Sequence, residues 1–264
     1  MSHLASSLLR CTRSSLRTTR PVFHSFTTRS IQGVSAVAQD PHTTNNTASP
    51  PPGTPTTTTS KTTGPQPSRP ETIDSLIAEL PLVQSLRQDP TYTESRPHLA
   101  MNPTHRPAHF VAGTLSGPNK ITVPPFMWCA TQRHAPSGRH HSQVVSVFHI
   151  GAQLCGHPGF VHGGLLTVMF DESFARCVST SFPSGSGMTA NLNVDFRKPA
   201  LPDRLYVLQA ETVKVEGRKA WVEGSLTSLP RRDEKGVDSV VVAEARALFV
   251  EPKFAKSMVP LYRQ

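Results

Sequence analysis

Several signals that would assign this chain to a common class of protein are missing from its sequence. Its 264 residues include only four cysteines, which form neither a Cys-x-x-Cys pair nor the spacing of a zinc site, so we expect free thiols in a reducing compartment. No run approaches the roughly 18 apolar residues of a membrane span, so we expect a soluble protein. The Gly-x-Ser-x-Gly, His-Glu-x-x-His and Gly-x-Gly-x-x-Gly motifs are absent too.

Acidic residues are missing from the first 39 positions, which carry five arginines and therefore +5 of the net charge of +9. A segment rich in Arg and Ser, poor in acids and able to form a short amphipathic helix is typical of a mitochondrial transit peptide. We therefore expect residues 1–39 to direct the protein to mitochondria, most simply to the matrix. The remaining +4 makes the body mildly basic, which suits an anionic small ligand at least as well as a nucleic acid.

Apolar side chains are scarce in residues 40–70, where Thr and Pro dominate, so we expect a disordered linker. Residues 71–97 form a different segment, in which Ile73, Leu76, Ile77 and Leu80 make the stripe of an amphipathic helix. This stripe predicts a helical arm packed on the folded domain, and a helix that binds a partner is the alternative. Residues 90–108, rich in Pro and His, predict an ordered loop.

One folded domain, about 98–255, is predicted from the pattern that follows. Short strand-like pieces at 110–115, 126–130 and 144–150 precede a helix at about 163–180. Beyond the helix, residues 188–196 alternate strictly between apolar and polar side chains, as in a strand with one face in the core. Further strands are expected at 205–215, 220–226 and 240–250, joined by turns that favour antiparallel neighbours.

The predicted helix at 163–180 is apolar nearly all round and therefore buried, yet it contains Asp171. Burial of a carboxylate costs free energy unless the group is paired or used, and it raises the carboxyl pKa, which suits a general base. The bland alternative is a carboxylate on the helix surface. Glu172 and Arg176 fit that alternative, because residues four apart on a helix can form a solvated ion pair.

The motifs around this helix resemble those of the hotdog-fold acyl-CoA thioesterases, in the branch similar to phenylacetyl-CoA thioesterase and to the mitochondrial thioesterase superfamily members. His162-Gly163-Gly164 is followed by Asp171 after nine residues. Met188–Asn193, then Phe196–Pro199, then Val215–Lys219 match further family motifs in order. The resemblance covers roughly residues 71–252.

This resemblance implies an α+β hotdog fold, in which a long central helix is wrapped by a five- to six-stranded antiparallel sheet. It also implies a dimer, or a dimer of dimers, that joins two sheets edge to edge with the active sites between protomers. The implied substrate is a fatty acyl-CoA, hydrolysed to free acid and CoA without a cofactor. Neither a nucleic acid nor a transmembrane segment is implied.

Catalytic roles follow from the same resemblance. Asp171 activates water or attacks the thioester. The Gly163 N–H, at the positive end of the helix dipole, binds the oxyanion, and Thr189 faces Asp171 from the partner protomer. His162 either orients the thioester or caps the loop.

Candidates for the CoA phosphates are Arg197, Lys198, Arg218 and Lys219, with ordinary surface charge as the alternative. Asp195 precedes the first pair where the family often has a neutral residue. A second departure is Gly156, six residues before His162, where many relatives have Asn or Gln.

Two further functions stay open at this point. A non-catalytic hotdog module could bind an acyl group or a protein within a mitochondrial assembly, and a hotdog dehydratase would need paired catalytic groups that the spacing does not supply. A metal site is not expected: His134, His140 and His141 share a polar loop without carboxylate or cysteine partners.

Overall fold

The computed structural model describes residues 70–132, 141–234 and 236–259. The expected transit peptide at 1–39, the linker up to residue 69, and His134 and His140 lie outside these residues. The described helices are α1 (Pro70–Ala78), α2 (Pro81–Gln88), α3 (Pro97–Ala100) and α4 (Gly163–Val178), with short 3₁₀ turns η1 (Arg106–Ala108), η3 (Ala152–Leu154), η4 (Ser179–Ser181) and η5 (Ala255–Ser257) and a π-helix, η2 (Phe110–Thr114). None of these helices combines the length and apolar character that crossing a bilayer requires.

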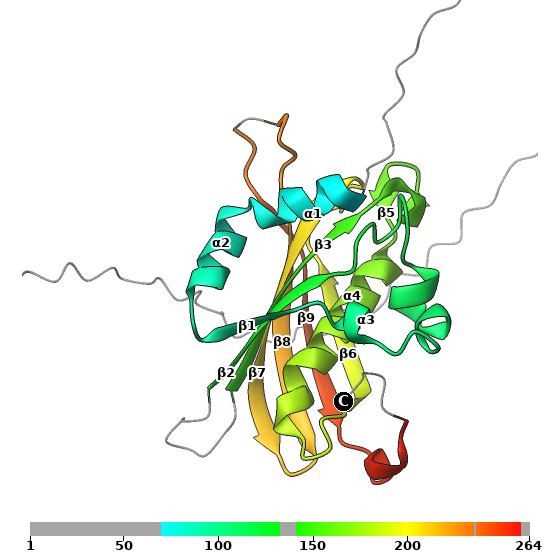
Figure 1. Ribbon diagram of the computed structural model, residues 1–264, viewed down its shortest axis with the longest axis vertical. Coiled ribbons are helices and arrows are strands. Elements are labelled where there is room, and N and C mark those ends of the chain that lie inside the picture. Colours follow the sequence, from blue (N-terminus) through cyan, green and yellow to red (C-terminus); the bar gives the residue numbers. More distant parts are fainter. Residues whose placement is uncertain (1–69, 133–140, 235, 260–264) are drawn as a thin grey trace, which may run out of the picture. The chain divides into compact units, whose positions relative to one another are not determined.

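Seven strands form one antiparallel sheet in the order β1-β2-β3-β7-β8-β9-β6 (Figure 1). Their bounds are β1 (Tyr92–Ser95), β2 (Phe126–Gln132), β3 (His141–Ile150), β6 (Met188–Phe196), β7 (Arg204–Glu216), β8 (Lys219–Ser228) and β9 (Val240–Val250). A separate hairpin of β4 (Cys155–His157) and β5 (Phe160–Val161) leads into α4. The sheet curves around α4, which confirms the expected α+β hotdog arrangement.

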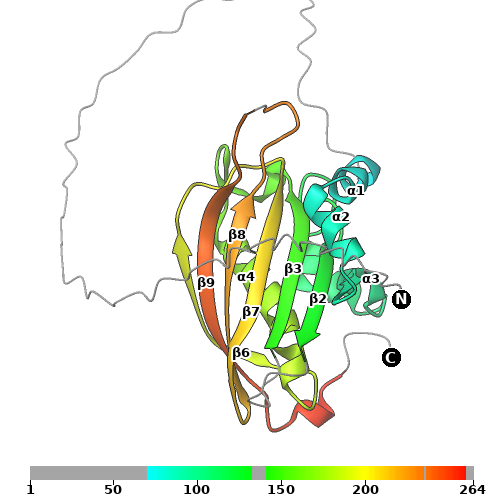
Figure 2. The same cartoon turned by 90° about the vertical axis from the view of Figure 1, so that its left-hand side faces the viewer.

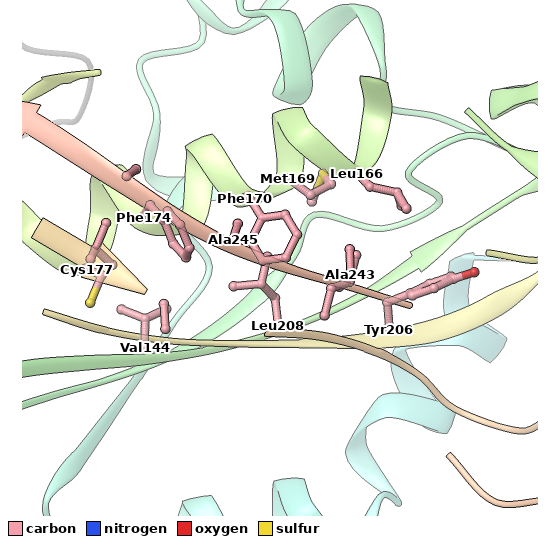
Figure 3. Packing of buried hydrophobic residues seen from close by; sticks show 14 of the residues in the cluster. Val144, Leu166, Met169, Phe170, Phe174, Cys177, Tyr206, Leu208, Ala243 and Ala245 are labelled. Atoms are coloured by element: carbon pink, nitrogen blue, oxygen red, sulfur yellow. The ribbon is translucent and has the colours of Figure 1, made fainter. Parts of the chain in front are cut away.

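Apolar side chains of α4 pack onto the concave face of the sheet (Figure 3). Phe170 and Phe174 are fully buried there, together with Leu208 of β7. Small residues on the facing strands let the helix approach: a Cβ on Gly224 of β8 would lie 2.7 Å from the Phe174 ring. Because removing a buried Phe side chain costs about 3–5 kcal/mol, this packing fixes the position of α4, and with it Asp171.

The opposite face of the sheet is covered by α1 and α2, beside β2 and β3 (Figure 2). Ile73 and Ile77, from the helical stripe that the sequence shows, are both buried against this face. Arg96 holds the arm in place, because its guanidinium pairs with Asp74 at 3.0 Å and lies 4.0 Å from the centre of the Phe126 ring. Two helices of this segment therefore pack on the sheet.

Two local predictions are wrong. Residues 110–115, expected as a strand, form the π-helix η2, because His109 Nδ1 accepts the Ala112 N–H at 3.1 Å and Gly113 packs directly on the backbone at Arg106. Residues 90–108, expected as a loop, contain β1, α3 and η1. β1 pairs with β2 and makes the described sheet seven-stranded instead of five- or six-stranded.

Candidate functional site

The start of α4 is organised by His162, its N-cap residue. The His162 Nδ1 accepts the Gly164 N–H at 2.9 Å, so one of the unpaired amides of the helix start is satisfied by the imidazole. Of the two roles that the sequence leaves open for His162, capping is the one seen here. The acceptor role of Nδ1 also leaves the proton of the neutral ring on Nε2.

Two glycines hold this imidazole between them. A Cβ on Gly156 would lie 2.7 Å from His162 Cδ2, and a Cβ on Gly164 would lie 2.9 Å from His162 Cε1 and Nδ1. A side chain at either position would push the ring out of its capping geometry. Gly156, which departs from the family pattern, is therefore a requirement of the way His162 packs in this chain.

The first amide of α4, that of Gly163, is available for a ligand. No acceptor for the Gly163 N–H is found among the described residues, and this N–H lies at the positive end of the α4 dipole. The ring of Phe196, at the end of β6, lies 3.4 Å from where a Cβ of Gly163 would be. Since Phe196 is 55% exposed, the amide opens beside an apolar surface that solvent reaches.

Asp171 lies two turns further along α4 and faces β6. Its Oδ1 accepts the hydroxyl proton of Thr189 at 2.5 Å, the length of a charge-assisted O–H···O bond. Both residues belong to the same chain, so the expectation that Thr189 reaches Asp171 from the partner protomer is wrong for this contact. Asp171 is also only partly buried, because its side chain points toward the sheet edge and not into the apolar core.

A β-bulge in β6 accompanies the Thr189 contact. Thr189 pairs with Phe249 and Asn191 with Leu248 of β9, so the intervening Ala190 has no partner. The bulge interrupts the strict alternation expected for residues 188–196: Leu192 and Val194 pack on the core, whereas Met188 and Phe196 are exposed. Bulges commonly redirect one side chain beside a functional site, and here the residue next to the bulge is the one that contacts Asp171.

The four cationic candidates are divided between two ends of β6 within one chain. Arg197 follows β6 and pairs with Glu244 at 2.7 Å and with Asp195 at 3.6 Å, and Lys198 is exposed beside it. Arg218 and Lys219 are exposed near the other end, where Lys219 and Met188 both pair with Val250. The strand between them is about 27 Å long at 3.4 Å per residue, so a single chain does not bring the two pairs together.

Sequence reasoning missed the surroundings of Glu172. Its carboxylate contacts His98 Nε2 at 3.2 Å and His109 Nε2 at 3.7 Å, whereas the sequence suggested only a pair with Arg176. The two histidines precede Glu172 by 74 and 63 residues, and no local pattern in the sequence connects such distant positions. His98 falls in the loop expected at 90–108, His109 directly follows it, and neither histidine was predicted to have a function.

A cavity of about 610 Å³ lies on the opposite face of the sheet, between α1 and the loops at Asn119, Asp203 and Arg231. None of the predicted site residues lines it. The predicted catalytic residues lie instead at the α4–β6 edge, where the Gly163 amide and the Asp171 carboxylate both reach the surface.

Comparison with known proteins gives a consistent assignment. Residues 158–235 match the sequence pattern of the thioesterase superfamily. An uncharacterised protein of Schizosaccharomyces pombe is 34% identical over 179 residues, which cover 68% of this chain and 93% of that protein. An uncharacterised mitochondrial protein of Candida albicans is 27% identical over 69% of this chain and 79% of its own length. The acyl-coenzyme A thioesterase THEM4 of Rattus norvegicus is 37% identical over 109 residues, or 41% of this chain, and this match spans only 43% of its length.

Proposed function

This chain belongs to the thioesterase superfamily, and from that premise we propose that it hydrolyses acyl-CoA thioesters to free fatty acid and CoA. The observation that carries the proposal is the Thr189–Asp171 hydrogen bond, which is 2.5 Å long. Asp171 lies on the helix whose first N–H, that of Gly163, has no acceptor among the described residues. Thr189 occupies one lone pair of the carboxylate and fixes its orientation. Because Asp171 is only partly buried, its remaining lone pairs can accept a proton from an attacking water.

The two groups that this chemistry needs lie far apart within one protomer. Gly163 and Asp171 are eight residues apart on α4, which corresponds to about 12 Å along the helix axis. A thioester carbonyl bound at Gly163 and a water held by Asp171 must lie within about 3.5 Å of each other for attack. We infer that the Gly163 N–H of one subunit serves the substrate that Asp171 and Thr189 of the other subunit attack.

The edge strand β6 is suited to bring two subunits together in this way. It pairs with β9 on one side, and its other edge has no partner strand among the described residues. Antiparallel pairing of two β6 strands about a two-fold axis would cover this edge and the exposed Met188 and Phe196. The same pairing places Arg197 and Lys198 of one subunit near Arg218 and Lys219 of the partner subunit, where together they can contact CoA phosphates.

Mitochondria, and most simply the matrix, are the proposed location. Support comes from the acid-free, arginine-rich residues 1–39 and from the Candida albicans relative whose name places it in mitochondria. Fusing residues 1–39 to a fluorescent reporter in fungal cells tests this directly. The fusion should be imported into the matrix, and a reporter that stayed in the cytosol would contradict the assignment.

The activity is tested with the purified full chain and acyl-CoA substrates from two to eighteen carbons. Release of CoA is followed with a thiol reagent, and sedimentation establishes the number of subunits. We expect turnover by a dimer or larger assembly with at least one chain length, lost in Asp171→Asn although that variant keeps the same assembly. Turnover by Asp171→Asn at the parent rate would refute the assignment.

A second candidate function is a binding module without turnover. The observation that favours it is Gly156, which leaves no side chain where many relatives have a polar residue that orients the substrate. In that case acyl-CoA binds, as measured by calorimetry, while no chain length is hydrolysed.

A further inference from the structure

A second cluster of ionisable side chains lies on a different face of α4 from the one that Thr189 contacts. It consists of His98 on α3, His109 at the start of η2, and Glu172 on α4. One nitrogen of each histidine and one oxygen of the carboxylate all lie within 4.8 Å of one another. The individual separations are 3.2 Å from His98 Nε2 to Glu172 Oε2 and 3.7 Å from His109 Nε2 to Glu172 Oε1.

The three groups are shielded but not sealed from solvent. The His98 side chain is 5% exposed, that of Glu172 25% and that of His109 16%. A single carboxylate therefore faces two imidazoles in a largely buried place, and the described ion pairs give Glu172 no lysine or arginine partner. This is a donor set of two imidazole nitrogens and one carboxylate oxygen, which is the chemistry that zinc prefers.

The three groups lie near the spacing that a zinc ion requires of its ligand atoms. Tetrahedral zinc with ligand bonds of 2.0–2.1 Å holds its ligand atoms about 3.3 Å apart. His98 Nε2 lies 3.2 Å from Oε2 and His109 Nε2 lies 3.7 Å from Oε1 of the Glu172 carboxylate, so each imidazole is already near one of its two oxygens. One nitrogen of each histidine and one carboxylate oxygen all lie within 4.8 Å of one another, so the side chains have at most about 1.5 Å to close around the ion.

We propose that His98, His109 and Glu172 bind a Zn²⁺ ion, with water or a ligand in the fourth position. The ion would join α3 and the η2 segment to α4, three parts of the chain whose ligands are distant in sequence. It would thus fix residues 97–114, which contain α3, η1 and η2, on the helix that carries Asp171. The proposed hydrolysis does not use the ion.

Binding requires one proton to move. His109 Nδ1 accepts the Ala112 N–H at 3.1 Å, so the proton of the neutral ring is on Nε2. A metal at Nε2 requires the other tautomer, with the proton on Nδ1, and the Ala112 N–H then loses this acceptor. Zinc binding is therefore coupled to the conformation of the first turn of η2.

The test is calorimetric titration of the chelator-treated full chain with zinc chloride. We expect one Zn²⁺ per protomer with a Kd of about 1 μM or tighter, and Co²⁺ in its place should give the visible absorption of a four-coordinate ion. His98→Ala and Glu172→Gln should each bind at least about tenfold more weakly. His105→Ala, which changes an exposed histidine of the same region, should bind as the parent does.

Two controls keep the outcome clear. Thermal unfolding in the presence of chelator shows whether each variant is folded, and Asp171→Asn should bind zinc with the parent affinity, so that a failure of the proposed hydrolysis is distinguishable from a failure of this site. Absence of binding in the parent would refute the site. Stoichiometric binding that persists in a folded His98→Ala, His109→Ala double variant would refute it as well, because the ion would then be held elsewhere.

Discussion

Asp171 and Glu172 are neighbours on α4, yet the structure gives them opposite surroundings. Successive residues of a helix point about 100° apart, so Asp171 faces the edge strand β6 and Glu172 faces α3 and η2. Asp171 has a single described side-chain partner, the Thr189 hydroxyl. Glu172 has two, the imidazoles of His98 and His109.

The difference lies in how many acceptor positions of each carboxylate are occupied. A carboxylate has about four acceptor sites. Thr189 uses one of those on Asp171 and leaves the others toward the surface, whereas the two histidines lie against both oxygens of Glu172. The open carboxylate suits proton transfer, and the enclosed one suits holding loops or an ion. Four sets of variants test the proposed site, and the first set compares the two carboxylates directly.

The largest effect is expected from Asp171→Asn, compared with Glu172→Gln. Loss of a general base lowers the rate by about 10²–10⁴-fold, so kcat for acyl-CoA hydrolysis should fall by that factor in Asp171→Asn with little change in the midpoint of thermal unfolding. Glu172→Gln should instead lower the midpoint and reduce kcat by less than about tenfold. An equal loss of kcat in both variants would abolish the contrast between the two carboxylates.

Sequence reasoning singled out Asp171 but not the partners of Glu172. The motif His162–Gly164, the step to Asp171 and the alternating strand at 188–196 are local patterns, and they predicted the start of α4 and the bounds of β6, while the assignment of the site stays a prediction. The partners of Glu172 come from segments 63 and 74 residues away. Residues that meet only after the chain has folded leave no periodic signal in one sequence.

Local chemistry misled the prediction at two places. Phe110, Val111 and Ala112 look like a strand, but the His109 cap and the packing of Gly113 on the Arg106 backbone favour a π-helix. β1 was missed because Tyr92–Ser95 is a mostly polar strand that pairs with β2 alone. In both cases contacts with other segments decide the structure, and intrinsic propensity does not.

The second-largest effect is expected where the His162 imidazole caps α4. The two variants to compare are Gly164→Ala and His162→Asn. The new Cβ in Gly164→Ala would lie 2.9 Å from the His162 ring, so the ring must move and the amide loses its acceptor. We expect a loss of about 1–2 kcal/mol in the free energy of unfolding, and a fall in kcat of about 10–100-fold because the adjacent Gly163 amide shifts.

His162→Asn separates capping from catalysis, since asparagine is also a good N-cap. Its free energy of unfolding, measured by chemical denaturation, should stay within about 0.5 kcal/mol of the parent. If Gly164→Ala unfolded at the parent denaturant concentration, the packing of the ring between Gly156 and Gly164 would not be what holds the helix start.

A smaller effect is expected at Thr189, where valine and serine form the matched pair. Valine has nearly the same shape but lacks the hydroxyl, so Asp171 loses its only described donor and kcat should fall by about tenfold, the value of one charge-assisted hydrogen bond. Serine keeps the hydroxyl and should stay within about threefold of the parent. Equal rates for the valine and serine variants would show that the Thr189–Asp171 bond does not orient the carboxylate.

The smallest effect is expected at the cations, and it extends the comparison from one helix to two subunits. Lys198→Ala and Lys219→Ala each remove one proposed phosphate contact and should raise KM for acyl-CoA by about threefold without changing kcat, because a solvated charge contributes less than about 1 kcal/mol. The matched control is Lys214→Ala, which removes a lysine paired with Glu216 and lying outside the proposed site.

If the two cationic ends meet only across the subunit interface, a mixed dimer with Lys198→Ala in one subunit and Lys219→Ala in the other contains one intact and one doubly altered site. Half of its sites then show the parent KM and half show a KM raised about ninefold, the product of the two single effects, whereas cations acting within one subunit would give two equally altered sites.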